Sequence, residues 1–276
     1  MAKAPKKTTT KAAPAKVETR EEETTALAPK EEETTALQTS EYGNLMDNDQ
    51  VDTRDLLLPR VLLMQGLSKF VADDKARMGE FRDSLEAKKL GGKDEPMSFI
   101  PFHSFKTWVI FKDTKGKLEY AETVPFTPDN MNWLREEVQG GVTVKRFQAI
   151  NYYVLLPSEI EAGEAFPYVL SFRSTSYKAG RKLETFKVKY KAIGKPLAWR
   201  NFLLSTTLQE NEKGKFYVMD VATGDVTKKE HLEAVSKWKD IISNANVRID
   251  ETDSEGEVGA ATSEEDGGAY SDDAQY

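Results

Sequence analysis

Alternating apolar and polar residues run through the middle of the chain and predict β-strands. The longest such segment is 98–113, SFIPFHSFKTWVIFKD, which is rich in aromatic and β-branched residues. Its two faces are Phe105, Thr107, Val109 and Phe111 on one side, and Lys106, Trp108 and Ile110 on the other. Shorter extended segments are expected at 60–65, 78–84, 147–157, 166–174, 196–208 and 215–222. The fold is therefore expected to be mainly β with a few helices (α+β).

Two helices are predicted from punctuation and from spacing. Residues 127–141 begin with a Thr–Pro pair and end in two glycines, which is typical of a helix with an N-terminal cap and a glycine stop. Residues 228–243 place their apolar residues at helical spacing, on one side of an amphipathic helix. That side consists of Leu232, Val235, Trp238 and Ile242.

The segment 176–193 fits two periods. With period two, Phe186, Val188 and Tyr190 oppose a row of lysines, as in a strand. With helical period, an apolar stripe is formed by Leu183, Phe186, Tyr190 and Ile193. Serines at the start and Gly194 followed by Pro196 at the end supply helix boundaries, so we predict a helix. Gly180 is expected to weaken it by about 1 kcal/mol relative to alanine.

The two ends of the chain differ from its centre. Residues 1–48 are low in large apolar groups and contain EEETTAL twice, at 21–27 and 31–37. Two copies are too few to stack as a repeat protein, so this arm is expected to be disordered. Residues 249–276, called the acidic tail below, are expected to be disordered for the same reason. The body between them is 49–248.

Charge is distributed unevenly along the chain. The whole chain has a formal net charge of −7. The acidic tail contains ten acids and no lysine or arginine, whereas the body carries 32 basic and 27 acidic residues. A mildly basic body joined to an anionic tail is typical of a protein that binds nucleic acid and has a competing or partner-binding tail.

The most basic stretch is 172–202. It holds nine basic residues, the single acid Glu184, and six aromatic residues. Cations that follow a phosphate chain, interleaved with rings on which bases stack, predict sequence-tolerant binding of a single strand. The candidate phosphate contacts are Lys106, Arg173, Lys178, Arg181, Lys182 and Arg200. The candidate stacking rings are Trp108, Tyr153, Tyr177 and Phe202, whereas Phe186 and Trp199 are expected in the core.

The chain resembles the single-stranded DNA-binding proteins of tailed bacteriophages. The resemblance rests on LPRVLLMQGLS (58–68), SFRSTSYKAGRKL (171–183), FLLSTTLQENEKGKFYV (202–218) and the terminal SDDAQY. It implies a five-stranded oligonucleotide-binding (OB) barrel in which a helix follows the third strand. The chain departs from the family in an N-terminal elaboration (55–97), a long insertion between the first two barrel strands and the terminal Tyr276. It also implies a role in phage DNA replication or recombination, with the tail recruiting partner proteins through Asp272, Asp273 and Tyr276.

No reactive constellation is visible, so we expect neither an enzyme nor a bound metal or cofactor. Cysteine is absent, and His103 and His231 fit structural or surface positions. No phosphate-binding glycine motif occurs. With no secretory signal or membrane span, the chain is expected to be soluble in the (host) cytoplasm. Two alternatives stay open: a virion structural protein, and an accessory transcription or recombination factor. The sequence does not distinguish DNA from RNA as the ligand, and it leaves the oligomeric state open.

Overall fold

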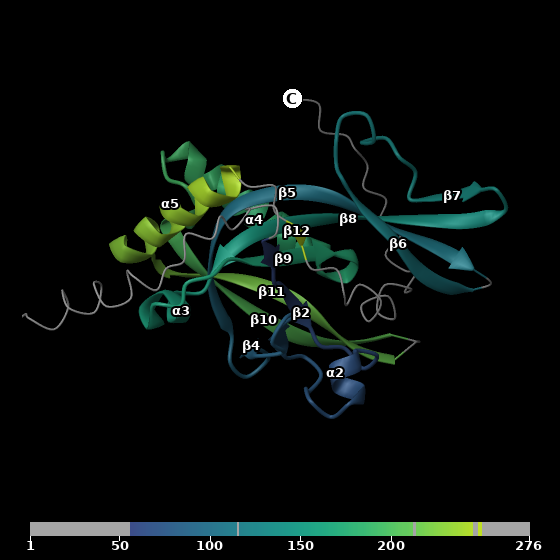
Figure 1. Cartoon of the computed structure of the whole chain (residues 1–276), viewed down its shortest axis with the longest axis horizontal. Helices are drawn as coiled ribbons and strands as arrows, with labels where there is room; N and C mark the ends of the chain where they lie inside the picture. The colour runs from purple at the N-terminus through teal and green to yellow at the C-terminus, as the bar shows by residue number, and fades with distance from the viewer. Residues whose placement is uncertain (1–55, 115, 212–213, 245–247, 250–276) are drawn as a thin grey trace, which may run out of the picture. The chain divides into compact units, whose positions relative to one another are not determined.

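The computed structural model describes residues 56–114, 116–211, 214–244 and 248–249. This part of the chain is mainly β, with one large mixed sheet and few helices (Figure 1). The predicted disordered segments, 1–48 and the acidic tail, lie outside the described residues apart from Ile249.

The large sheet follows the order β11-β10-β5-β8-β9-β2-β3-β4, and β6 and β7 branch from β5 and β8. Its strands are β2 (Arg60–Leu63), β3 (Phe81–Asp83), β4 (Lys89–Gly91), β5 (Met97–Thr114), β6 (Lys117–Pro125), β7 (Glu136–Gln139), β8 (Val142–Leu155), β9 (Tyr168–Arg173), β10 (Arg200–Asn211) and β11 (Gly214–Val226). A second, two-stranded sheet pairs β1 (Leu57–Leu58) with β12 (Arg248–Ile249) in parallel. The α-helices are α2 (Lys69–Ala72), α3 (Pro157–Ala162), α4 (Tyr177–Ala192) and α5 (Lys229–Asn244).

Strand β5 belongs to two parts of the fold. Its first residues pair with β10, where Phe99 lies opposite Phe202. From Thr107 onward its neighbour on that edge is β6, while β8 accompanies it on the other edge along most of its length. The order β6-β5-β8-β7 therefore forms an antiparallel arm that projects from the rest of the sheet (Figure 1).

The expected closed barrel is not present. Among the described residues, no backbone ladder joins the two end strands of the sheet, β11 and β4. Strands β2, β3 and β4 extend the sheet beyond β9, because β2 pairs with β9 in parallel. A five-stranded barrel would close along this edge of β9, but β2 occupies it. The resemblance gave no indication that the N-terminal segment would pair there.

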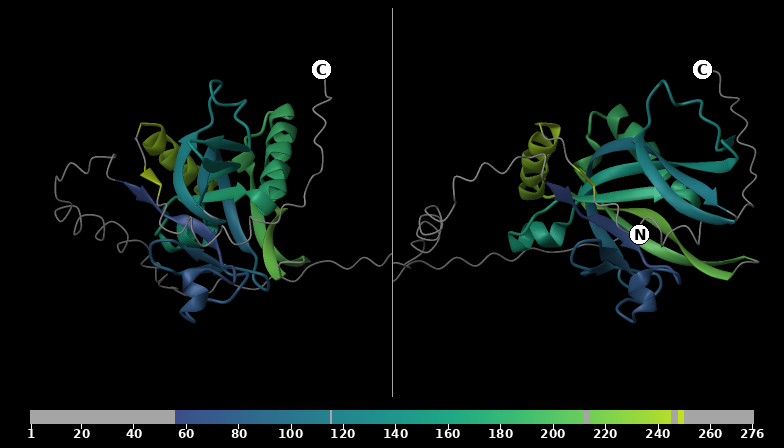
Figure 2. Two further views of the ribbon diagram at one scale, coloured as in Figure 1. Left: turned by 90° about the vertical axis from the view of Figure 1, so that its right-hand side faces the viewer. Right: turned by 45° about the vertical axis from the view of Figure 1, so that its right-hand side comes forward.

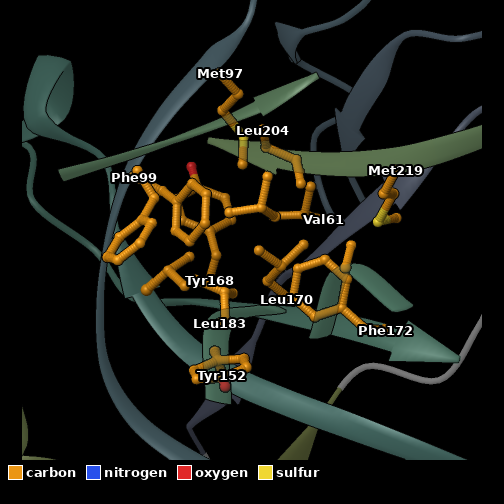
Figure 3. Packing of buried hydrophobic residues seen from close by; sticks show 14 of the residues in the cluster. Val61, Met97, Phe99, Tyr152, Tyr168, Leu170, Phe172, Leu183, Leu204 and Met219 are labelled. Atoms are coloured by element: carbon orange, nitrogen blue, oxygen red, sulfur yellow. The ribbon is translucent and has the colours of Figure 1, made fainter. Parts of the chain in front are cut away.

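The main core lies between the sheet and α4. It is built from β-strand side chains such as Leu170 and Phe172 together with Leu183 and Tyr190 of α4 (Figure 3). Helix α4 comes very close to the strands at Gly180, where an added Cβ would stand 2.8 Å from the Cβ of Phe172. The predicted helix is confirmed, and its glycine is the position of closest approach.

The predicted helix over 127–141 is wrong. The Thr–Pro pair opens a turn in which the side chain of Asn130 accepts a hydrogen bond from the backbone N–H of Thr127 (2.8 Å). Gly140 and Gly141 have φ of 58° and 83° and connect β7 to β8, so that Gln139 pairs with Val142. Two residues with positive φ form the tight turn of a hairpin, and glycine is favoured at both places. The two glycines mark a hairpin and not the end of a helix.

The other predicted elements are present with small shifts of boundary. The strands over 98–113, 147–157, 166–174 and 215–222 and the helix over 228–243 are confirmed. In the last of these, Leu232, Val235 and Trp238 pack in one apolar cluster and Ile242 in a neighbouring one. The sequence did not predict β1, β4, β6, β12, α2 or the short helix α3, whose residues are too polar to stand out from a loop.

Candidate nucleic-acid interface

Helix α4 carries the densest group of cations among the described residues. Its apolar side packs on the sheet through Ala179, Gly180, Leu183 and Tyr190. The outward side exposes Lys178, Arg181, Lys182, Lys189 and Lys191, and Lys187 is exposed at the margin next to β5. The left view of Figure 2 shows α4 as the long green helix beside the sheet. An apolar side that anchors the helix thus leaves a long cationic side facing solvent.

The one acid of α4 is engaged by the sheet. Glu184 accepts a hydrogen bond of 2.6 Å from the hydroxyl of Tyr152, and its other oxygen lies 3.6 Å from the ammonium of Lys187. Burial and the adjacent carboxylate of Glu184 raise the pKa of Tyr152. The hydroxyl therefore stays protonated and donates to Glu184. The negative charge of Glu184 is turned toward the sheet and offsets little of the outward cationic side.

Three side-chain contacts fix α4 against β5 and β8. The hydroxyl of Tyr177 donates to the side-chain oxygen of Gln148 (3.1 Å). Glu184 binds Tyr152 as above, and the ammonium of Lys187 donates to the hydroxyl of Ser104 (2.6 Å). These contacts follow one face of the sheet, because Gln148, Ile150 and Tyr152 are alternate residues of β8.

Lys106 lies on the same face as α4. It is the strand partner of Ile150, whose side chain faces Gly180. Its exposed ammonium lies 5.9 Å from the ring centre of Phe126. The structure therefore brings Lys106 and the α4 residues Lys178, Arg181 and Lys182 to one side of the sheet. We call this set, together with Lys187, the α4 surface.

Two predicted phosphate contacts are elsewhere. Arg173 is the strand partner of Ala149, which puts its side chain on the opposite face of the sheet, 5.9 Å from the ring centre of Phe111. Arg200 lies beyond the C-terminal end of α4. Its guanidinium donates to the carbonyl of Gly224 (2.9 Å) and covers the ring of Trp199 at 5.1 Å. The predicted cationic set is thus divided among three places.

Two predicted stacking rings are in the interior. Trp108 is 2% exposed, and Phe202 is fully buried. Trp108 donates to the carbonyl of Asn130 (3.2 Å) and packs against Phe126 and Trp133. A ring without an exposed face cannot stack on a base, so neither residue belongs to the interface. Sequence alternation placed Trp108 correctly on a face but could not show that the loop after β6 covers that face.

The remaining aromatic predictions divide as follows. Tyr177 is half-buried at the start of α4, beside the α4 surface. Tyr153 is only 9% exposed and lies on the face of the sheet away from α4. Phe186 and Trp199 are partly buried and pack against the main core, as expected. Asp272, Asp273 and Tyr276 of the acidic tail lie outside the described residues.

Two charged residues were not singled out from the sequence although they help to form the surface. Lys187 was one of the nine cations of 172–202, but nothing in the sequence indicated that it would reach Ser104. Asp220 of β11 lies 3.1 Å from the ammonium of Lys182 and pairs with it. A phosphate that binds Lys182 would therefore compete with the carboxylate of Asp220.

Comparison with known proteins gives a family. The model of the family described as "Pam3 phage gp34-like protein" matches residues 23–248. The chain belongs to this family. It is therefore a phage protein, and the match extends over the whole described sheet. No curated protein and no solved structure matches the chain. No helix in the described part is long and apolar enough to span a membrane.

Proposed function

We propose that this phage protein binds single-stranded DNA with little sequence preference, chiefly through the α4 surface. The observation that carries the proposal is the position of α4. Its cations face solvent along a helix of 16 residues, while its acid is turned inward. Such a helix extends for about 24 Å, long enough to follow several phosphates of a strand. Binding by cations and stacking needs no base-reading motif.

The strand order supports the same proposal. The part β11-β10-β5-β8-β9, with α4 between β9 and β10, has the pairing order of an oligonucleotide-binding fold. The arm made by β6 and β7 is an insertion between the first two of these strands. We therefore interpret the fold as an open, elaborated relative of that barrel, acting in phage DNA replication or recombination in the host cytoplasm.

The acidic tail supplies the second part of the proposal. Its ten carboxylates imitate a phosphate chain and are tethered to the same molecule. Tethering gives an effective concentration that can reach about millimolar, enough to compete with weak DNA binding. Bound DNA then displaces the tail and leaves Asp272, Asp273 and Tyr276 available to another replication or recombination protein.

Titration of labelled oligonucleotides tests the binding proposal. Fluorescence anisotropy would compare oligo(dT), poly(U) and duplex DNA at two salt concentrations. Log affinity for oligo(dT) is expected to fall with log salt, with a slope of about 0.7 per phosphate neutralised. A flat salt response or equal affinity for duplex would contradict the proposal, and absence of binding would favour a virion structural role.

A paired substitution tests the α4 surface itself. Replacing Lys178 and Arg181 by glutamate is expected to weaken oligo(dT) binding and lower the salt slope. The matched control replaces Lys117 and Lys215, two exposed lysines at hairpin ends away from α4, by glutamate. Both variants change the net charge equally. Equal losses in the two would mean that only overall charge matters and that α4 is not the interface.

A further inference from the structure

The middle of β5 has an open edge among the described residues. On the edge away from β8, β10 pairs only with Met97–Phe99 and β6 only from Thr107 onward. Residues 100–105 have no strand partner on that edge, and the carbonyl of Lys106 accepts a hydrogen bond from the N–H of Phe126 (3.0 Å). A register irregularity between Pro101 and His103 also bends the strand here. Ile100 and Phe102 pack against Ala198 and the α5 residues Leu232 and Val235, and His103 is the exposed side chain of the gap.

Four rings gather at this gap, on the face away from Lys106. Tyr153 is the centre, and its ring lies 5.7 Å from His103, 5.0 Å from Phe105 and 6.2 Å from Phe102. The rings of His103 and Phe105 are themselves 6.3 Å apart and nearly parallel, at 30°. Tyr153 is buried, Phe105 is half-buried and His103 is exposed. The group is a stack of rings whose outer member is open to solvent.

Two cations flank the exposed ring. Lys187 of α4 binds Ser104, the residue after His103. Lys239 is exposed on α5, three residues before Ile242, which packs in the same cluster as Tyr153 and Phe105. Partial burial of the ring on the side that packs against Phe105 and Tyr153, and then the ammonium groups of Lys187 and Lys239, lower the pKa of His103 below its ordinary value. At neutral pH the imidazole is therefore uncharged, and its flat face is available for stacking.

We propose that His103, backed by Phe105 and Tyr153, is a base-stacking site for single-stranded nucleic acid, with Lys187 and Lys239 holding the phosphates on either side. The proposal rests on the function above and extends it. Lys187 also belongs to the α4 surface, which lies on the opposite face of the sheet from the ring stack, so a bound strand would pass from one to the other around the unpaired edge of β5. This site replaces the stacking role that Trp108 and Phe202 cannot fill.

Photocrosslinking locates the site directly. An oligo(dT) carrying 5-iodouracil would be bound to the full-length protein, irradiated and mapped by mass spectrometry. Crosslinks at His103 or Phe105 are expected. Crosslinks confined to other residues, from a protein that does bind the oligonucleotide, would overturn the site and leave the proposed function intact. A protein that binds no oligonucleotide would overturn both.

Substitutions give the energetic test. His103→Ala is expected to weaken oligo(dT) binding about tenfold, the usual effect of removing one stacking ring. His103→Phe keeps a flat ring and is expected to bind nearly as tightly as the wild type. Because His103 is exposed, both variants should fold, which thermal unfolding would verify. If His103→Ala and His103→Phe bind equally well, stacking at this ring is excluded.

Lys239 has a matched control on its own helix. Lys229 is also exposed on α5 and pairs with Glu233 (3.6 Å) at the start of the helix. Lys239→Ala is expected to weaken binding and lower the salt slope by about 0.7, whereas Lys229→Ala should leave both unchanged. Equal effects of the two substitutions would remove Lys239 from the site.

Discussion

The side-chain amide of Gln65 pairs with the backbone of Tyr217, 152 residues away in the sequence. Its nitrogen donates to the carbonyl of Tyr217 (2.7 Å), and its oxygen accepts from the N–H of Tyr217 (3.0 Å). This amide makes the two bonds that a neighbouring strand would have made. It joins the chain just after β2 to β11, an end strand of the sheet. A nearby bond from Thr206 to the carbonyl of Gly79 (3.0 Å) reinforces the same junction.

Replacing Gln65 by alanine should therefore destabilise the fold. Gln65 is buried, and its loss leaves a backbone donor and acceptor without their partner, at a cost of about 1–3 kcal/mol. Chemical denaturation would measure the free energy of unfolding. Gln139→Ala, at an exposed position of β7, is the control and should change little. Equal stability of the two variants would mean that the bridge contributes nothing.

Gly180→Ala should lower stability although alanine favours helices. Helix propensity alone would stabilise α4 by about 1 kcal/mol. The new Cβ would, however, meet Phe172 at 2.8 Å and Ile150 at 3.3 Å, and overpacking of this kind costs about 1–3 kcal/mol. Thr185→Ala, on the exposed side of the same helix, is the matched control and should be neutral or stabilising. A more stable Gly180→Ala protein would show that α4 can move away from the sheet.

Deleting residues 250–276 should tighten binding to oligo(dT) at low salt. The deletion removes all ten acids of the acidic tail and keeps β12. The gain should be severalfold and should shrink as salt screens the competing charges. Anisotropy titrations at a series of salt concentrations would measure it. A control tail in which the ten acids are replaced by Asn and Gln should behave like the deletion, and weaker binding by either protein would contradict the competition.

Acidification should destabilise the wild type more than a His103→Asn variant. The pKa of His103 is lowered in the folded protein, mainly by burial, so the unfolded chain binds the proton more readily. Stability linked to this group is present above its ordinary pKa, near 6.5, and is lost as pH falls through the lowered value. Thermal unfolding of both proteins between pH 7.5 and 5 would give the difference. Parallel curves would show that the imidazole does not titrate as described.

The periodic elements were predictable because the spacing of their apolar residues matches the side that is buried in the fold. In α4, the stop at Gly194 and the stripe of Leu183 and Tyr190 matched a helix lying on a sheet. The expected serine cap is wrong, because the hydroxyl of Ser176 makes no capping bond and accepts instead from the N–H of Met219 (3.3 Å). The segment before β8 shows the opposite case. Thr127 and Pro128 satisfy the rules for a helix start, but Gly140 and Gly141 adopt positive φ and reverse the chain into a hairpin. Local composition allows either outcome, and pairing with β8 decides between them.

The site was predictable only in part, for a related reason. Lysines and arginines on α4 are exposed because the helix has one apolar side, and the spacing of apolar residues in the sequence predicts that side. Whether a strand aromatic is covered depends on distant segments. Trp108 is covered by residues near Trp133, whereas His103 is exposed in the stretch of β5 between its pairings with β10 and β6. A single sequence does not show which distant segments pack against a given strand residue.

Strand β5 joins the arm to the main core through one continuous backbone. It runs from Phe99 in the core to Phe111 in the arm, with a register irregularity at Pro101–His103 beside the exposed ring of His103. Phe99 packs against Phe202 at the end of the strand opposite the arm. The position of the arm is therefore coupled through β5 to the packing of this pair.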